Sequence, residues 1–361
     1  MIGPNARWWT REGDRFVCSL CPRACRVKPG QRAFCFSRMG GEDGMVLTDY
    51  GRSSGFCLDP IEAMPLHHYR PGSRVLAFGT MGCNLACRYC QNWDIARAGD
   101  DARLLDEAGP EAIAAAAKRL GCQAVALSFN DPVMWAELAL DVSEAAHAQQ
   151  LDVVAKTAGY ISDGAREELF GALDAVSVDL KGFSEDFYRR VCGGQLGPVL
   201  DTLRFVAQTR TWLEIVTLLI PGENDSDAEL AALCTWVAEN LGPHVPIHFN
   251  AYHPEHRMAL PATPPATLAR ARAHAAAAGL RTSFSANAGA ESALDTLCSS
   301  CGTLLIARRG FHIQAWNLVD GACPGCGVAV DGRFEAQPGR SVARRFGVRL
   351  GAPPPVNPTP S

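Results

Sequence analysis

The 361-residue sequence predicts an α/β protein built as an open, partial TIM-type barrel. Short apolar runs rich in Val, Leu, Ile and Ala alternate with amphipathic helical patterns along most of the chain. This alternation indicates parallel strands joined by right-handed helical crossovers. The pattern supplies only about six or seven strand–helix units, which is fewer than the eight of a closed barrel. The sheet is therefore expected to stay open.

Most of the expected strands are short and apolar, as strands buried on both faces should be. They are residues 75–80, 123–129, 152–157, 175–180, 212–220, 245–250 and, as the weakest, 281–285. The expected helices are 111–120, 133–149, 163–171, 197–210, 226–241 and 264–278. In barrels of this kind, functional groups sit at the carboxyl ends of the strands.

Composition and charge exclude several classes of function. The formal net charge is −4 and no dense basic run occurs, so no nucleic-acid partner is expected. No apolar stretch reaches the length of a membrane span, and residues 1–9 lack the apolar core of a signal peptide. We therefore expect a soluble, cytoplasmic protein that does not bind membranes.

Fifteen cysteines are present, and most of them are clustered. In a cytoplasmic protein, clustered cysteines indicate metal binding rather than disulfides. The three clusters are Cys18, Cys21, Cys25 and Cys35; Cys83, Cys87 and Cys90; and Cys298, Cys301, Cys323 and Cys326. The remaining thiols, Cys57, Cys122, Cys192 and Cys234, are expected to be buried and inert.

The middle cluster follows the first expected strand with the spacing C-x3-C-x2-C. Three cysteines this close can hold three irons of a [4Fe-4S] cube and leave the fourth iron open to a small molecule. A zinc knuckle is the competing interpretation, but zinc prefers paired C-x2-C hooks and four ligands. Buried free thiols are the third interpretation.

The two flanking clusters differ in character. Cys18 to Cys35 read C-x2-C-x3-C-x9-C in a segment with little periodicity, and they suit either a structural zinc or a second iron–sulfur cluster. Cys298 to Cys326 form two C-x2-C-G knuckles around an expected hairpin at Arg309-Gly310. That pattern predicts a zinc ribbon, with an auxiliary cluster as the alternative.

Polar residues end each expected strand. Taken singly, each of these groups would be a solvated loop or a helix cap. Together, in a barrel whose first loop carries the cysteines, they converge on one mouth. They include Asn130-Asp131, Lys156-Thr157, Asp179, Lys181 and His253.

Several stretches resemble a known family. They are CSLCPRACRVKPGQRAFC, DPIEAMPLHHYRPGSRV, GTMGCNLACRYCQNWDIA, VDLKGFSEDFYRRVCGG, LLIPGENDSDAEL, PIHFNAYHP and the double knuckle. The chain resembles radical S-adenosylmethionine (SAM) proteins related to pyruvate formate-lyase activating enzymes, and in particular the radical SAM protein of the AmmeMemoRadiSam system. Together with composition and cysteine spacing, the resemblance divides the chain into four expected segments: a Cys-rich part (1–70), a partial radical SAM barrel (71–292), a double-knuckle module (293–335) and a tail (336–361) that is expected to be disordered because it is rich in proline.

The resemblance also implies a mechanism and a set of site residues. Cys83, Cys87 and Cys90 would ligate the catalytic [4Fe-4S] cluster. A flavodoxin- or ferredoxin-type donor would reduce it, and SAM would be cleaved to a 5′-deoxyadenosyl radical that abstracts hydrogen from a small-molecule substrate. The alternatives are sulfur insertion with an auxiliary cluster and activation of a glycyl-radical enzyme. The residues implied to contact SAM are Tyr89, Asn130, Asp131, Lys156, Thr157, Asp179, Lys181 and His253.

Two departures from the family pattern stand out at the third strand. Related activating enzymes commonly read Thr-Asn-Gly where this chain has Thr157-Ala158-Gly159. Some carry an acidic cation ligand at the position of Lys156. We hypothesise that the Lys156 ammonium replaces a bound cation beside the SAM carboxylate. In the competing interpretation, Lys156 points away toward a carboxylate partner.

Overall fold

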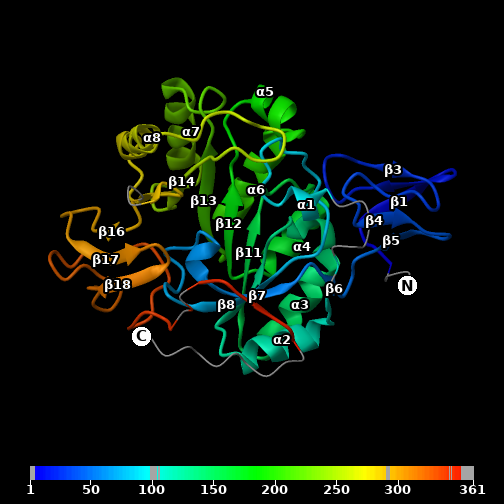
Figure 1. Ribbon diagram of the computed structural model, residues 1–361, viewed down its shortest axis with the longest axis horizontal. Helices are drawn as coiled ribbons and strands as arrows, with labels where there is room; N and C mark the ends of the chain where they lie inside the picture. The colour runs from blue at the N-terminus through cyan, green and yellow to red at the C-terminus, as the bar shows by residue number, and fades with distance from the viewer. Residues whose placement is uncertain are drawn as a thin grey trace.

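A nine-stranded, mostly parallel sheet forms the centre of the molecule in the computed structural model (Figure 1). The structure describes residues 5–97, 104, 106–289, 293–340, 342 and 344–350. The strand order is β15-β14-β13-β12-β11-β10-β8-β7-β19, and the sheet does not close. Its parallel strands are β8 (Arg74–Phe78), β10 (Ala124–Leu127), β11 (Asp152–Thr157), β12 (Ala175–Asp179), β13 (Trp212–Leu219), β14 (Ile247–Ala251) and β15 (Ser283–Ala286). The open α/β barrel predicted from the sequence is confirmed.

The helices follow the strands in the expected alternation. They are α2 (Pro110–Arg119), α3 (Ala136–Ala148) with the 3₁₀ turn η3 (Pro132–Trp135) before it, α4 (Asp163–Gly171), α6 (Gly197–Ala207), α7 (Asp227–Asn240) and α8 (Pro265–Ala277). Short helices α1 (Trp93–Ala96) and α5 (Glu185–Phe187) lie in loops. In α2, Pro110 occupies the first turn, where its missing N–H costs nothing, and Lys118 and Arg119 lie at the negative end of the helix dipole.

Both faces of the parallel strands are buried, and their side chains alternate between two cores. Leu76 and Phe78 of β8 belong to the large core that is shared with the helices. Val75 and Ala77 face the inside of the barrel and pack against the segment Ile61–Tyr69. This segment, which includes the 3₁₀ turn η1 (Ile61–Ala63), therefore fills part of the inner face that an open barrel would leave to solvent.

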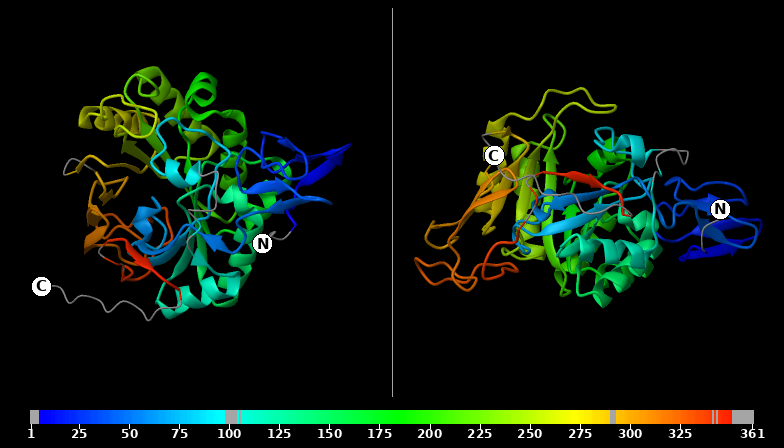
Figure 2. Two further views of the ribbon diagram at one scale, coloured as in Figure 1. Left: turned by 45° about the vertical axis from the view of Figure 1, so that its right-hand side comes forward. Right: turned by 60° about the horizontal axis from the view of Figure 1, so that its bottom comes forward.

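The N-terminal residues form short strands where the sequence showed little periodicity. The sheet β1 (Trp9–Glu12), β2 (Arg15–Cys18) and β3 (Arg26–Val27) lies beside the hairpin β4 (Arg38–Gly40) and β5 (Met45–Leu47), at one side of the barrel (Figure 2). Strand β6 (Arg52–Ser53) pairs with β9 (Asp106–Glu107). A buried ion pair ties this region to α3, because Arg38 Nη2 lies 2.6 Å from Glu137 Oε2.

The C-terminal residues form a three-stranded sheet on the opposite side of the barrel from β1–β5 (Figures 1 and 2). It consists of β16 (Thr296–Leu297), β17 (Leu304–Arg309) and β18 (His312–Trp316). The hairpin turn is at Gly310-Phe311, one residue after the predicted position at Arg309-Gly310. The tail that we expected to lack structure contributes β19 (Phe346–Val348), which pairs with β7 (Phe56–Pro60) at the sheet edge. Residues 351–361, the Pro-rich end of that tail, lie outside the described residues. No helix in the described part of the chain is long and apolar enough to cross a membrane.

Candidate active site

One cavity of about 550 Å³ opens at the carboxyl ends of the parallel strands. Cys83, Cys87 and Cys90, in the loop after β8, all line it. Lys156 at the end of β11 and Asp179 at the end of β12 line it as well. The structure thus brings together the three thiols and two of the strand ends that were singled out from the sequence.

The cysteine loop is held by backbone hydrogen bonds to a segment far away in the sequence. Ala86 N–H donates to Cys192 O (2.8 Å) and Arg88 N–H donates to Val191 O (3.0 Å). Gly82 begins the loop with φ of +85°, and a Cβ at this position would lie 1.8 Å from Cys35 O. Only glycine fits there, because the N-terminal Cys-rich segment packs directly against the loop.

Burial disfavours the charged form of two of the three thiols. It raises the pKa of Cys83 well above its ordinary value and the pKa of Cys90 to about 11. Leu85 N–H points at Cys83 Sγ over 3.4 Å, so a backbone donor is in place for a thiolate. Among the described residues, the group of ligand atoms gathered closely enough for a single ion is at the C-terminal cysteines and does not include these three thiols.

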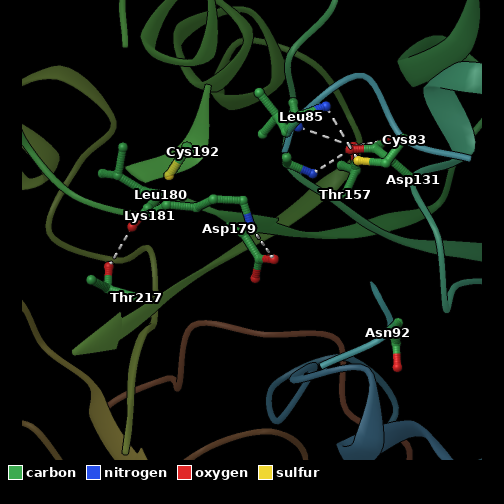
Figure 3. A network of polar contacts seen from close by, with 12 residues as sticks. Cys83, Leu85, Asn92, Asp131, Thr157, Asp179, Leu180, Lys181, Cys192 and Thr217 are labelled. Carbon is green, nitrogen blue, oxygen red and sulfur yellow. Dashed lines mark hydrogen bonds and ion pairs between the residues drawn. The ribbon is translucent and has the colours of Figure 1, made fainter. Parts of the chain in front are cut away.

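Cys192 is a functional candidate that the sequence reasoning classed as an inert thiol. It is fully buried in the π-helical turn η4 (Tyr188–Cys192), and its hydrogen bond to Cys87 lowers the pKa of Cys87. The Tyr89 hydroxyl lies 3.8 Å from Cys192 Sγ. Figure 3 shows Cys192 near Lys181. The one signal for Cys192 in the sequence was its place before Gly193-Gly194, where Gly193 adopts φ of +67° beside Ala86.

Three of the strand-end residues use their side chains within the protein. Asn130 Nδ2 donates to Met81 O (2.8 Å) and Gly82 O (3.1 Å), which fixes the start of the cysteine loop. Asp131 accepts hydrogen bonds from Thr157 Oγ1 (2.8 Å) and Ala158 N–H (2.9 Å) (Figure 3). These side chains therefore join the ends of β8, β10 and β11 to one another.

Two lysines and one aspartate carry the charge on the next part of the wall. Lys181 Nζ lies 3.0 Å from Asp179 Oδ2 (Figure 3). Burial would raise the pKa of Asp179, but the charges of Lys181 and Lys156 hold it below its ordinary value. Lys156 acts on this carboxylate without a direct ion pair to it.

The two remaining predicted SAM contacts are placed differently from each other. Tyr89 is buried and lines the cavity with its ring near Phe187. His253 is exposed, does not line the cavity, and its Nε2 lies 2.9 Å from Asn287 O. Asn287 itself lines the cavity, so His253 contacts a residue of the cavity wall but not the cavity.

The four C-terminal cysteines converge as ligands of one ion. The sulfur atoms of Cys298, Cys301, Cys323 and Cys326 all lie within 4.8 Å of one another. Cys298 and Cys326 are 3.6 Å apart, as are Cys301 and Cys323. A tetrahedral zinc with bonds of about 2.3 Å sets sulfur atoms about 3.8 Å apart, so this donor set fits a zinc ion.

The N-terminal cysteines behave differently. Cys18, Cys21 and Cys35 are buried and Cys25 is half-buried. Their charges act on one another, yet their sulfur atoms are not gathered within single-ion distance. Burial raises the pKa of Cys21 to about 11 and that of Cys35 to about 12.

Comparisons with known proteins agree with this site. Residues 78–234, which include the cysteine loop, match the family model of the radical SAM superfamily. An uncharacterised protein of Methanocaldococcus jannaschii is 33% identical over 323 residues, which is 89% of this chain and 96% of that protein. The benzylsuccinate synthase activating enzyme of Thauera aromatica is 30% identical over 121 residues, 33% of this chain and 35% of that enzyme.

A solved structure of similar fold is a domain of the pyruvate-formate lyase-activating enzyme from Bacteroides vulgatus. It shares 18% sequence identity with a TM-score of 0.41, and the match covers 45% of this chain and 99% of that domain. Three findings support the same family. The family model matches, the archaeal relative aligns with 89% of this chain, and a three-cysteine loop lies at the mouth of the open α/β barrel. The chain is an enzyme that belongs to the radical SAM superfamily.

Proposed function

We propose that Cys83, Cys87 and Cys90 hold a [4Fe-4S] cluster whose open iron binds SAM, and that the enzyme acts on a small molecule. One observation carries this proposal: three thiols from one loop line a single cavity without forming a single-ion site. Three thiolates on a cube leave one iron without a protein ligand. When bound and reduced, the cluster supplies the electron that cleaves SAM into methionine and a 5′-deoxyadenosyl radical, which takes hydrogen from the substrate.

The residues of this chain position the reactants and exclude water. Lys156 lines the same cavity as the thiols and has no direct ion pair with Asp179, so its ammonium suits the SAM carboxylate. The Asp179–Lys181 pair offers an acceptor and a donor for the polar groups of SAM. Asn130, Asp131 and Thr157 act indirectly, because their bonds fix the loop and strand ends that bear these groups.

The small-molecule assignment is supported by how the cavity is enclosed. Gly310 and Phe311, at the tip of the β17–β18 hairpin, line it on one side. Met64 and His67, from the segment that fills the inner face of the barrel, line it on another. These segments cover part of the cavity, which limits the access of water to a radical, and a cavity of this size has room for a small substrate. The external reductant is proposed to be a flavodoxin- or ferredoxin-type protein.

The test is anaerobic reconstitution followed by reduction with dithionite in the presence of SAM. The wild-type protein should release 5′-deoxyadenosine, detected by mass spectrometry. A variant with Cys83→Ala, Cys87→Ala and Cys90→Ala should lose that product and about four irons. The matched control is Cys234→Ala, which removes a buried thiol on α7 away from the cavity and should keep both. Product formation by the triple variant would refute the proposal.

The metal content of the same preparations separates the alternatives. About four irons and one or two zinc ions would support a single catalytic cluster, because each four-cysteine site holds one zinc or one cluster. About eight irons would favour sulfur insertion with an auxiliary cluster at Cys18, Cys21, Cys25 and Cys35. The C-terminal group is proposed to hold zinc, in line with its sulfur spacing.

A further inference from the structure

The deep end of the cavity carries a set of polar side chains that the proposed chemistry of cleaving SAM does not use. Two of them lie on β14 and two on the segment before β8. Asn250 lies near the carboxyl end of β14, and His248 lies two residues deeper on the same face. Glu62 and His67 reach the same cavity from the segment before β8. We call Glu62, His67, His248 and Asn250 the cavity floor.

The floor is held by one buried carboxylate, Glu214, near the start of β13. Glu214 accepts hydrogen bonds from His248 Nε2 (2.7 Å), from the N–H groups of His67 (3.0 Å) and His68 (2.7 Å), and from Trp212 Nε1 (3.0 Å). Burial alone would raise the pKa of Glu214, but the bond to His248 holds it below its ordinary value. Its acceptor positions are filled, so it orients His67 and His248 and is not itself free to bind a ligand.

Three floor residues present polar atoms that no described residue satisfies. Glu62 is 2% exposed; its Oε1 accepts from Gly72 N–H (2.7 Å), while its Oε2 has no partner. His67 is 3% exposed and its Nδ1 has no partner. Asn250 Oδ1 is also unpartnered. A buried polar atom left without a hydrogen bond costs about 1–3 kcal/mol, so a donor bound in the cavity would stabilise these acceptors.

Glu62 is the floor carboxylate that keeps an unpartnered oxygen among the described residues, because Glu214 is already paired with His248 over 2.7 Å. Three carboxylates, Glu62, Glu214 and Asp295, act on the single buried guanidinium of Arg308. Arg308 does not neutralise Glu62 directly, because its Nη1 donates to Leu294 O (2.9 Å) and its Nη2 to His67 O (2.8 Å). Burial raises the pKa of Glu62 to about 7, and a bound positive charge would relieve that cost.

We propose that the cavity floor binds an amino group of the substrate, with Glu62 Oε2 and Asn250 Oδ1 as acceptors of its N–H bonds. The substrate class is therefore a small amine whose amino end enters the barrel ahead of the reacting carbon. His67 and His248 border the amine as an aromatic wall, and their rings lie edge to face with centroids 4.6 Å apart. This inference rests on the proposed function, because the reacting end of the amine must face SAM at the thiols.

The test uses the full-length, oxidised holoenzyme loaded with SAM, which does not turn over. Butylamine, butanol and butyrate serve as probes of one length and three chemistries, and saturation-transfer NMR measures their binding. Butylamine should bind at least about tenfold more tightly than the other two, because a charged hydrogen bond contributes about 1.5–3 kcal/mol. Glu62→Gln should remove that preference, and Asn250→Ala should weaken it. Glu144→Gln, on the exposed face of α3, is the matched control.

Each result of the binding experiment either supports or overturns the proposed amine site. Equal or tighter binding of butyrate, no binding of butylamine, or unchanged butylamine binding by Glu62→Gln would overturn the inference. Folding of each variant is checked by SAM binding, which the floor residues do not touch. Release of 5′-deoxyadenosine from the reduced enzyme is scored separately. The proposed function therefore stands or falls on that product, and the amine site stands or falls on the three probes.

Discussion

The Thr157 hydroxyl donates to the Asp131 carboxylate over 2.8 Å, and Ala158 N–H donates to the other oxygen of the same carboxylate. Asp131 also accepts from Val133 N–H at 3.1 Å. One buried carboxylate thus joins the ends of β10 and β11 beside the cysteine loop. Sequence motifs alone suggested that Asp131 and Thr157 touch SAM, whereas their geometry supports a role in shaping the cavity wall.

Asp131→Asn should therefore destabilise the protein. The substitution places an NH₂ group where two or three donors converge, and a buried donor left without an acceptor costs about 1–3 kcal/mol. We expect the free energy of unfolding, measured in guanidinium chloride, to fall by about that amount, and SAM binding to weaken with it. Asp201→Asn, which alters an exposed ion pair with Arg204 on α6, should change stability by less than about 1 kcal/mol. Equal effects of the two substitutions would contradict this role.

Glu62 makes stability depend on pH. Burial raises its pKa to about 7 from an ordinary value of 4.5, so the folded protein holds the proton more tightly than the unfolded chain. Its contribution is fully present below about pH 4.5 and is lost as the pH rises through about 7. In the Glu62→Gln variant, the fall in the free energy of unfolding with rising pH should be smaller by up to about 3 kcal/mol. The measurement is the difference in free energy of unfolding between pH 5 and pH 8. A parallel pH dependence in both proteins would show that Glu62 is ionised throughout.

The C-terminal thiols allow a separate prediction about metal. Cys301→Ser removes one ligand of the proposed zinc ion, and the ion holds together the module that carries Arg308 and Phe311. We expect the variant to lose one equivalent of zinc, as measured by elemental analysis, while its iron content stays unchanged. Its thermal transition should move several degrees lower, because metal binding contributes folding free energy. Cys57→Ser, at a half-buried thiol outside the cluster, should keep the zinc.

The sequence predicted the parallel strands to within about three residues, because strands buried on both faces are apolar runs bounded by polar ends. It also located the cysteine loop, whose spacing is local. The meeting of His67, Glu214 and His248 was not foreseen, because the three residues come from separate segments. Their meeting depends on strand register, which single-sequence patterns do not specify. A charged Glu214 inside the apolar strand WLEIVTLL was the available signal.

The N-terminal segment shows the same limit. Its short strands carry no long period, and Gly82 packs on Cys35 only because the two segments meet in space. The tail was expected to lack structure because it is rich in proline. Even so, Phe346–Val348 completes the edge of the main sheet on β7, a pairing across nearly the whole chain.

Cys192 should change the reduction potential of the proposed cluster without being one of its ligands. Its thiol donates toward Cys87, and hydrogen bonds to ligand sulfurs raise the reduction potential of iron–sulfur clusters. Cys192→Ala should keep about four irons yet lower the midpoint potential by roughly 40 mV, the equivalent of a neutral hydrogen bond of about 1 kcal/mol. Redox titration followed by electron paramagnetic resonance measures the potential. Loss of the irons would instead make Cys192 a ligand, and an unchanged potential would make it a packing residue.

Lys156 provides the sharpest test of how SAM is held. Its ammonium lines the cavity, feels the Asp179 charge, and forms no direct ion pair with that carboxylate. If it takes the place of a bound cation at the SAM carboxylate, Lys156→Gln should raise the KM for SAM about tenfold or more, because a charged hydrogen bond contributes about 1.5–3 kcal/mol. Lys156→Asp should go further and make SAM cleavage depend on added Na⁺ or K⁺, since the new carboxylate recreates a cation site beside the substrate.

The wild-type enzyme should be indifferent to exchanging Na⁺, K⁺ and a bulky organic cation at constant ionic strength. The matched control is Lys118→Gln, at the exposed end of α2, which should leave the KM for SAM unchanged. A wild-type enzyme that already requires a monovalent cation, or a Lys156→Gln variant with an unaltered KM, would return Lys156 to the competing role of a charge that balances Asp179.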